Sequence, residues 1–218
     1  MRSGMFMVGL CLLAACGAPQ TDAPAGLGDA CVDIGLDQGC SVVAAGLLND
    51  GPGDERLHWQ IQDGASAEDG VGGGLAIFAE TEDGQLEQLI TDTTAWRYEA
   101  PVFIRDGDSN PPLLVVHGTS RGTSASPINL AWQWGEAGWR RIDLGAWHGE
   151  AETILGEASI QNGFRIDFEN MLGVTPLWRS VDGRCCPSGG WARIDFELRE
   201  RVLHVTSASA YPTEAAPR

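Results

Sequence analysis

The stretch 191–198 alternates apolar and polar side chains at successive positions. On an extended chain one face would carry Ala192, Ile194, Phe196 and Leu198, and the other Arg193, Asp195 and Glu197. A period of two is typical of a strand that buries one face, as strands of antiparallel sheets do. The segment 199–201 can turn the chain, so we expect 202–205 to pair back as a hairpin. The chain therefore has to build an antiparallel sheet.

Comparable runs, separated by turn residues, fill most of the chain. Further strands are expected at 57–61, 75–80, 85–90, 101–105, 113–117, 128–134, 139–144 and 164–168. Asp83-Gly84 predicts a hairpin turn, 41–48 is a candidate first core element, and the glycine-rich stretch 64–74 is expected to be an exposed loop. The spacing of Trp147, Ala151, Ile154 and Leu155 predicts one short helix. We therefore expect an all-β fold: a single antiparallel β domain at 31–212, meander-like or sandwich-like, with one or two short helices.

Three stretches resemble one another, each with a glycine, an aromatic residue and an Arg, Ile and Asp in close succession: 138–144, 163–169 and 190–197. Such periodicity can indicate β repeats, for example propeller blades. It is equally the way in which a turn followed by an edge strand is encoded, and a closed propeller needs at least about four blades. Both interpretations remain open.

The N-terminal residues form a lipoprotein signal. Arg2 is followed by an apolar run of about nine residues, far shorter than a membrane span, and then by the lipobox Leu13-Ala-Ala-Cys16. We expect residues 1–15 to be removed, Cys16 to be lipidated, and residues 16–30 to be a flexible tether. Gly17 stands where an Asp would be expected for the inner membrane, and the resemblance to Gram-negative lipoproteins therefore implies the outer membrane, with the domain in the periplasm or at the cell surface. Residues 213–218 are a tail.

The charge balance restricts the partners. The formal net charge is −16, and all basic residues are arginines. Nucleic acid binding needs a basic face and is not expected. We expect the membrane to be contacted through the lipid anchor alone, we expect no cofactor, and a protein or glycan partner stays unidentified.

Four cysteines remain when Cys11 is removed with the signal and Cys16 is lipidated: Cys31, Cys40, Cys185 and Cys186. In an oxidising compartment they predict two disulfides, and their spacing does not suit zinc. Adjacent cysteines point to opposite faces of a strand, so pairing each with a distant partner avoids distortion. Chain entropy also favours this cross-link between the N-terminal loop and the last hairpin.

The loop 182–190 resembles that of the LppP/LprE lipoproteins, secreted bacterial proteins of unknown function with an Asp-x-x-Cys-Cys-Pro-[Ser/Thr]-Gly sequence before a terminal β segment. The resemblance covers roughly thirty residues and is specific only in its cysteine-containing core. It implies a secreted β domain and no activity. It also implies a self-contained loop in which the two cysteines pair with each other, so both disulfide patterns remain possible.

Apparent catalytic and metal motifs are weak. His117 and Ser124 belong to fragments similar to subtilisin-type proteases, but both fragments share one short loop, and we expect these residues to be catalytically idle. Asp106, Asp108 and Asn110 resemble the start of a Ca²⁺ loop, although Pro111 stands where such a loop needs glycine. No catalytic residue and no metal ligand can be assigned from the sequence.

Trp132, Trp134 and Trp139 are the candidate binding residues, because they surround one turn and could form an aromatic platform for a glycan. Packing in the core or across strands is the alternative use of these rings. We expect a non-enzymatic binding or structural module of the cell envelope. The alternatives are a small hydrolase that cleaves envelope polymers with carboxylates, and a calcium-stabilised β module.

Overall fold

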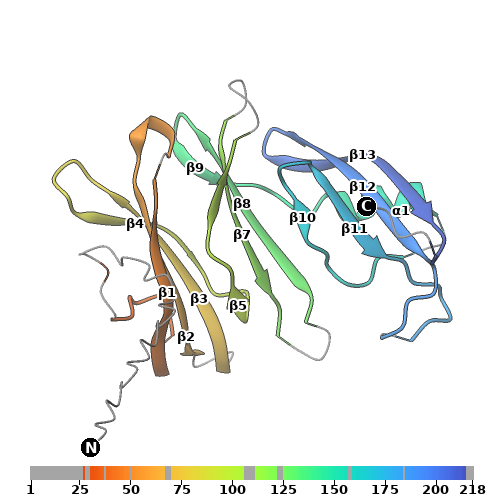
Figure 1. Cartoon of the computed structure of the whole chain (residues 1–218), viewed down its shortest axis with the longest axis horizontal. Helices are drawn as coiled ribbons and strands as arrows, with labels where there is room; N and C mark the ends of the chain where they lie inside the picture. The colour runs from red at the N-terminus through yellow and green to blue at the C-terminus, as the bar shows by residue number, and fades with distance from the viewer. Residues whose placement is uncertain are drawn as a thin grey trace, which may run out of the picture.

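The computed structural model describes residues 27, 30–36, 38–49, 51–66, 70–105, 111–121, 125–156, 159–183 and 185–214. These residues form three antiparallel sheets, one α-helix and one 3₁₀ turn (Figure 1). The all-β prediction is confirmed. No helix in the described ranges has the length and apolarity that crossing a membrane requires.

The three sheets follow one another along the chain. The first sheet has the order β1-β2-β3-β4, with β1 Gln38–Leu48, β2 Leu57–Ser66, β3 Gly70–Glu80 and β4 Leu86–Asp92, and the 3₁₀ turn η1 (Pro52–Asp54) joins its first two strands. The second has the order β5-β7-β8-β9, with β6 also paired to β7; the bounds are β5 Arg97–Tyr98, β6 Val102–Ile104, β7 Leu113–Thr119, β8 Pro127–Gly135 and β9 Gly138–Arg141.

Helix α1 (Trp147–Leu155) connects the second sheet to the third, whose order is β10-β11-β12-β13. The bounds are β10 Ile166–Asp167, β11 Leu172–Pro176, β12 Trp191–Arg199 and β13 Val202–Tyr211. Glu150 fixes the helix to β13, because its carboxylate accepts a hydrogen bond from the backbone N–H of Val205 (2.7 Å) and lies 2.8 Å from Nδ1 of His204. The expected helix, the β3–β4 hairpin and the β12–β13 hairpin are all present.

The second sheet is the middle layer and is buried on both faces. One face contributes Leu114, Val116, Leu130 and Trp132 to a core shared with the first sheet. The other contributes Ile104, Leu113, Val115 and Ala131 to a core shared with the third sheet and α1. Because both faces of β7 are buried, its sequence has an uninterrupted apolar run at 113–116, and all four of these residues are buried.

The loop expected at 64–74 was wrong. Its flanks belong to β2 and β3, which pair in continuous register from Leu57↔Ala79 to Ser66↔Gly70. Glycine permits a close backbone approach here: a Cβ at Gly73 would meet the carbonyl oxygen of Trp96 at 2.6 Å. Gly73 therefore allows a close approach to the neighbouring segment of the chain from within β3.

The three similar stretches do not occupy equivalent places. They correspond to β9 at the end of the second sheet, β10 at the start of the third and β12 inside the third. The sequence pattern shared by many turns that precede an alternating strand therefore accounts for the similarity better than a structural repeat does.

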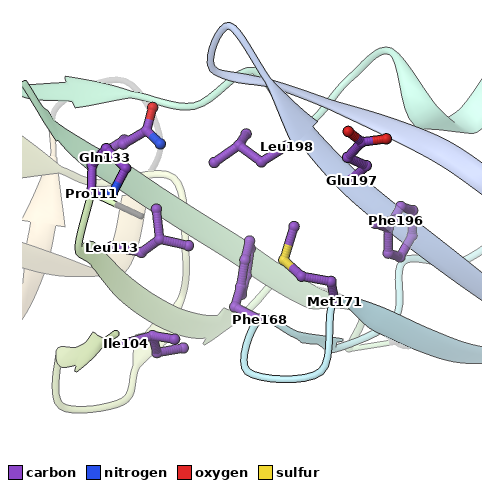
Figure 2. Close-up of a pocket in the computed structure, with 9 residues that line it drawn as sticks. All are labelled: Ile104, Pro111, Leu113, Gln133, Phe168, Met171, Phe196, Glu197 and Leu198. Carbon is purple, nitrogen blue, oxygen red and sulfur yellow. The ribbon is translucent and has the colours of Figure 1, made fainter. Parts of the chain in front are cut away.

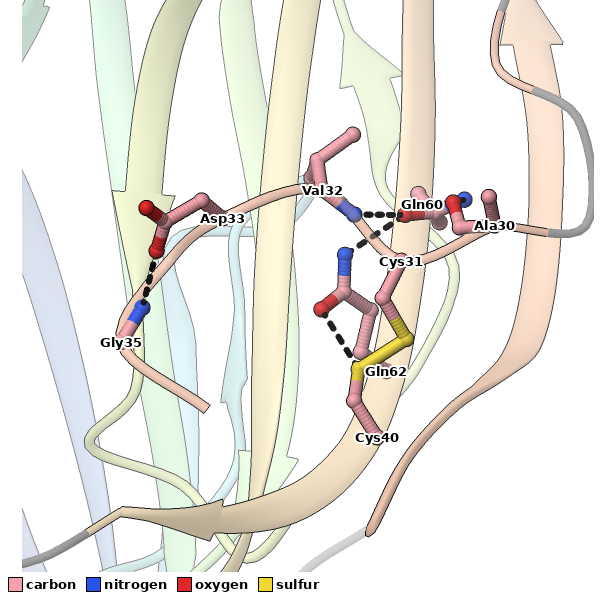
Figure 3. The surroundings of a disulfide bond; sticks show 8 residues. All are labelled: Ala30, Cys31, Val32, Asp33, Gly35, Cys40, Gln60 and Gln62. Atoms are coloured by element: carbon pink, nitrogen blue, oxygen red, sulfur yellow. Dashed lines mark hydrogen bonds between the residues drawn. A yellow bond between two sulfur atoms is a disulfide. The ribbon is translucent and has the colours of Figure 1, made fainter. Parts of the chain in front are cut away.

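The outer face of the first sheet is covered by residues 30–36 (Figure 3). Gln60 and Gln62 are fully buried beneath this segment, and Nε2 of Gln62 donates to Oε1 of Gln60 (2.6 Å). Gln60 in turn donates to the carbonyl oxygen of Ala30 and accepts from the backbone N–H of Val32. The Cys31–Cys40 disulfide closes the segment against β1.

The favoured cross-link between the N-terminal loop and the last hairpin was wrong, because the structure pairs Cys31 with Cys40 and Cys185 with Cys186. The first pair lies on the first sheet and the second in the loop before β12, so the middle layer separates them (Figure 1). Chain entropy favours long closed loops, but it cannot overcome a layer of packed strands between the partners.

Candidate interlayer groove

An apolar groove opens where the second and third sheets meet (Figure 2). It encloses about 330 Å³ and is lined by Ile104, Pro111, Leu113, Gln133, Phe168, Met171, Phe196, Glu197 and Leu198. Phe196 and Leu198 come from β12 and Leu113 from β7, while Phe168 and Met171 come from the turn between β10 and β11. Several of these side chains belong to the buried core. The groove is therefore a place where that core reaches the surface.

A second hollow of about 380 Å³ shares Ile104 and Phe168 with the first, and its remaining lining combines the apolar Val102 and Ile166 with four polar or charged side chains. It includes His117 of β7 together with Arg165, Asp167 and Glu169 around β10. The two hollows adjoin, and we call them together the interlayer groove. The groove has an apolar end and a polar end.

Asn129 on β8 fixes the polar end across the two sheets. Its Nδ2 donates to the carbonyl oxygen of Phe164 (2.7 Å), and its Oδ1 accepts from the backbone N–H of Ile166 (3.0 Å). Because these two bonds assign the donor and the acceptor, the side-chain amide of Asn129 can adopt only one of its two flipped orientations. Because Oδ1 lies 3.0 Å from Nδ1 of His117, Nδ1 has to carry the hydrogen of the neutral ring.

His117 therefore offers an acceptor. Burial lowers its pKa, and the nearby Arg165 guanidinium lowers it further, whereas Asn129, Glu99 and Asp167 oppose the shift. The imidazole is neutral at pH 7, and its Nε2 carries a lone pair.

Carboxylates dominate the remaining charges at this end. Nη1 of Arg165 donates to Oε1 of Glu99 at 2.5 Å, and this bond lowers the pKa of Glu99. Burial alone would raise the pKa of Asp167, but hydrogen bonds from the side chain and backbone of Asn170 and the backbone of Glu169 lower it overall. The formal charges of Glu99, Arg165, Asp167 and Glu169 add up to −2 at this end.

The candidate tryptophans lie elsewhere, around the first and second sheets. Trp132 is buried between these sheets. Trp134 and Trp139 face each other across β8 and β9 with ring centroids 5.3 Å apart, and Nε1 of Trp139 donates to Glu55 (2.9 Å). Trp139 also stacks on Phe103. These rings are used in cross-strand and interlayer packing.

Several predicted residues fall outside the described ranges: Cys16, Asp106, Asp108, Asn110 and Ser124. Within those ranges no group of three or more His, Cys, Asp or Glu side chains is arranged to hold a metal ion. Asn129 and Arg165 were not expected to be site residues, and His117 was considered only as part of a protease-like fragment.

Comparison of the chain with protein-family models, with curated proteins and with solved structures finds no match in any of the three. Only the side chains that line the groove indicate which ligand it could bind.

Proposed function

We propose that the protein is a non-enzymatic binding module of the bacterial cell envelope, whose interlayer groove binds an extended peptide with a basic side chain beside apolar ones. The observation that carries the proposal is the adjacency of an apolar hollow and an acceptor-rich polar one. Apolar side chains of the ligand would contact Met171 and Leu198, and its cation would lie near His117, Asp167 and Glu169. Together the hollows have the size of an ordinary ligand site.

Charge complementarity supports a cationic ligand. The polar end combines ionised carboxylates with the unprotonated nitrogen of His117, so it accepts hydrogen bonds and favours positive charge. The net charge of −16 adds a long-range attraction for cations.

The carboxylates support binding over hydrolysis. A general acid needs a pKa raised toward neutrality. The carboxyl groups with resolved shifts are instead stabilised in their ionised form, as Asp182 and Asp195 are by hydrogen bonds from Ser188 and Ser207. Ionised carboxylates suit the recognition of a cation.

Peptide binding tests the proposal. A pentapeptide with fluorescein in place of an acetyl group at its N-terminus, fluorescein-Phe-Leu-Lys-Leu-Phe-amide, should bind at least about tenfold more tightly than the same peptide with a central Glu, because a hydrogen bond to a charged group contributes about 1.5–3 kcal/mol. The affinity, measured by fluorescence anisotropy, should be constant from about pH 8 down to about pH 6.5, which is the ordinary pKa of histidine. Because the pKa of His117 is lowered, the affinity should weaken only below that pH, as His117 becomes charged.

Two substitutions with the same charge change localise the binding. Met171→Lys places a cation and a long polar chain in the groove and should weaken binding of the Lys peptide at least about tenfold. Val181→Lys makes the same change at an exposed position of the loop before β12 and should leave binding unchanged. Equal affinity for both peptides, or equal losses in both variants, would exclude the groove as a cationic peptide site.

The location in the envelope rests on the lipobox at 13–16. Replacing Cys16 by Ser removes the thiol that would carry the diacylglycerol, so the variant should leave the membrane fraction or accumulate unprocessed. The measurement is fractionation of cells followed by intact mass analysis. A processed Cys16→Ser protein that remains with the membrane would contradict the anchor.

A further inference from the structure

The loop between β11 and β12 presents two adjacent, exposed cysteines on a preformed base. Leu177 closes that base: its N–H donates to the carbonyl oxygen of Gly190 (2.9 Å) and its carbonyl accepts from the N–H of Gly189 (2.8 Å). Cys185 and Cys186 lie at the other end of the loop. Their disulfide is therefore in contact with solvent.

Asp182 ties the two sides of the loop together without using the cysteines. Its carboxylate accepts from the backbone N–H of Arg179 (2.7 Å), the backbone N–H of Ser188 (2.8 Å) and the hydroxyl of Ser188 (2.6 Å). These bonds lower the pKa of Asp182 and keep it ionised. The acid and the serine of the Asp-x-x-Cys-Cys-Pro-Ser sequence thus form one clamp around the cysteine pair.

The other disulfide has a different setting. Cys31 and Cys40 are half-buried against β1 and β2, with their Cα atoms 6.3 Å apart, inside the usual range of about 4.4–6.8 Å. For Cys185 and Cys186 the separation is 3.8 Å, because they are neighbours along the chain, and closing a bond between neighbours makes a small ring that includes the peptide. A bond with such a constraint and open access is more easily reduced than an unconstrained one.

We propose that Cys185 and Cys186 form a reversible dithiol/disulfide site that exchanges electrons with dithiols in solution. A thiolate of the dithiol attacks one cysteine sulfur, the S–S bond breaks, and the released cysteine thiolate takes up a proton. The second thiol of the dithiol then attacks the mixed disulfide and releases the second cysteine as a thiol. Two electrons pass to the protein, and the dithiol becomes a cyclic disulfide.

The clamp makes this exchange compatible with the fold. The bonds of Asp182 to Arg179 and Ser188, and the base at Leu177, do not involve either sulfur. Reduction should therefore leave the three sheets assembled. The Cys31–Cys40 disulfide is the internal reference for an unreactive pair.

The experiment equilibrates the full chain in mixtures of reduced and oxidised dithiothreitol, traps free thiols with N-ethylmaleimide and maps them after trypsin digestion. Arg184 and Arg193 bracket the peptide 185–193, and the N-terminal pair lies in the peptide that ends at Arg56. The peptide 185–193 should gain two labels at a ratio of reduced to oxidised reagent at least about 100-fold lower than the N-terminal pair needs. The melting temperature at that ratio should stay within about 2 °C of its starting value.

The double substitution Cys185→Ser and Cys186→Ser should remove the early labelling and leave the N-terminal transition unchanged. Reduction of both pairs at one ratio, or of the N-terminal pair first, would overturn the proposal. Labelling of 185–193 before any reductant is added, or a digest in which this peptide is linked to the N-terminal one, would overturn it as well.

Discussion

Replacing Gly190 by alanine is expected to destabilise the protein by about 3–5 kcal/mol. Gly190 has a φ of +93°, in the region that side chains rarely occupy. A Cβ there would also overlap the backbone carbonyl oxygen of Tyr211 on β13, which cannot rotate away as a side chain could. The residue lies just before the Trp191↔Tyr211 pair, so relieving the overlap would break the β12–β13 ladder at its end.

Gly183→Ala is the matched control for this substitution. Gly183 belongs to the same loop, and an added Cβ would meet open space. Urea unfolding is followed by tryptophan fluorescence. The free energy of unfolding of the control should lie within about 0.5 kcal/mol of that of the parent protein, and that of the Gly190 variant should be far lower than both. Two variants of equal stability would show that the close approach of Gly190 to β13 is wrong.

Asn129→Ala is expected to cost about 2–4 kcal/mol of stability, because one half-buried amide satisfies groups on both layers. Its removal leaves the Phe164 carbonyl, the Ile166 N–H and Nδ1 of His117 without the partners that now join β8 to β10. Since His117 would no longer be held in one tautomer, the variant should also lose affinity for the Lys peptide beyond what its lower stability explains.

Asn170→Ala is the matched control, because it removes an asparagine side chain that does not join the two layers. The Asn170 side chain makes one exposed hydrogen bond, from Nδ2 to Asp167 (2.7 Å), and its removal should change stability by no more than about 0.5 kcal/mol. Thermal unfolding of both variants at one pH provides the comparison. A small effect at Asn129 would mean that the two layers are not joined through this amide.

Much of the fold was predictable from side-chain periodicity. Strand β12 and helix α1 each carry a clear period, the turn at 199–201 predicted the hairpin partner of β12, and all three are present. The stretch 64–74 failed because glycine contributes no side chain to a pattern, so strands that use it for close packing resemble a loop. The order of the layers was not predictable, since the run 113–116 indicates burial on both faces without naming the neighbours.

Part of the polar end, the His117–Asn129 pair, could have been predicted by counting residue pairs along the β7–β8 hairpin. Pairing Thr119 with Pro127 places His117 opposite Asn129 in the β7–β8 hairpin. Arg165 and Asp167 could not be added in this way, because Asp167 belongs to the third sheet, Arg165 directly precedes that strand, and both reach the hairpin only through interlayer packing. The cysteine pairing failed for a related reason: chain entropy describes the unfolded state, whereas the pairing is set by which layer each cysteine occupies.

The succession of the sheets along the chain also bears on how a nascent polypeptide would assemble. Each sheet is built from consecutive strands, so a chain that emerges N-terminus first can close one layer with short loops before the next is available. The middle layer is complete at Arg141, yet the core on its second apolar face, to which α1 and β10 contribute first, is completed only after β12 begins at Trp191. During that interval the nascent chain exposes an apolar surface to aggregation. Lengthening the segment between these points should therefore lower the yield of folded protein before it lowers the stability of what has folded.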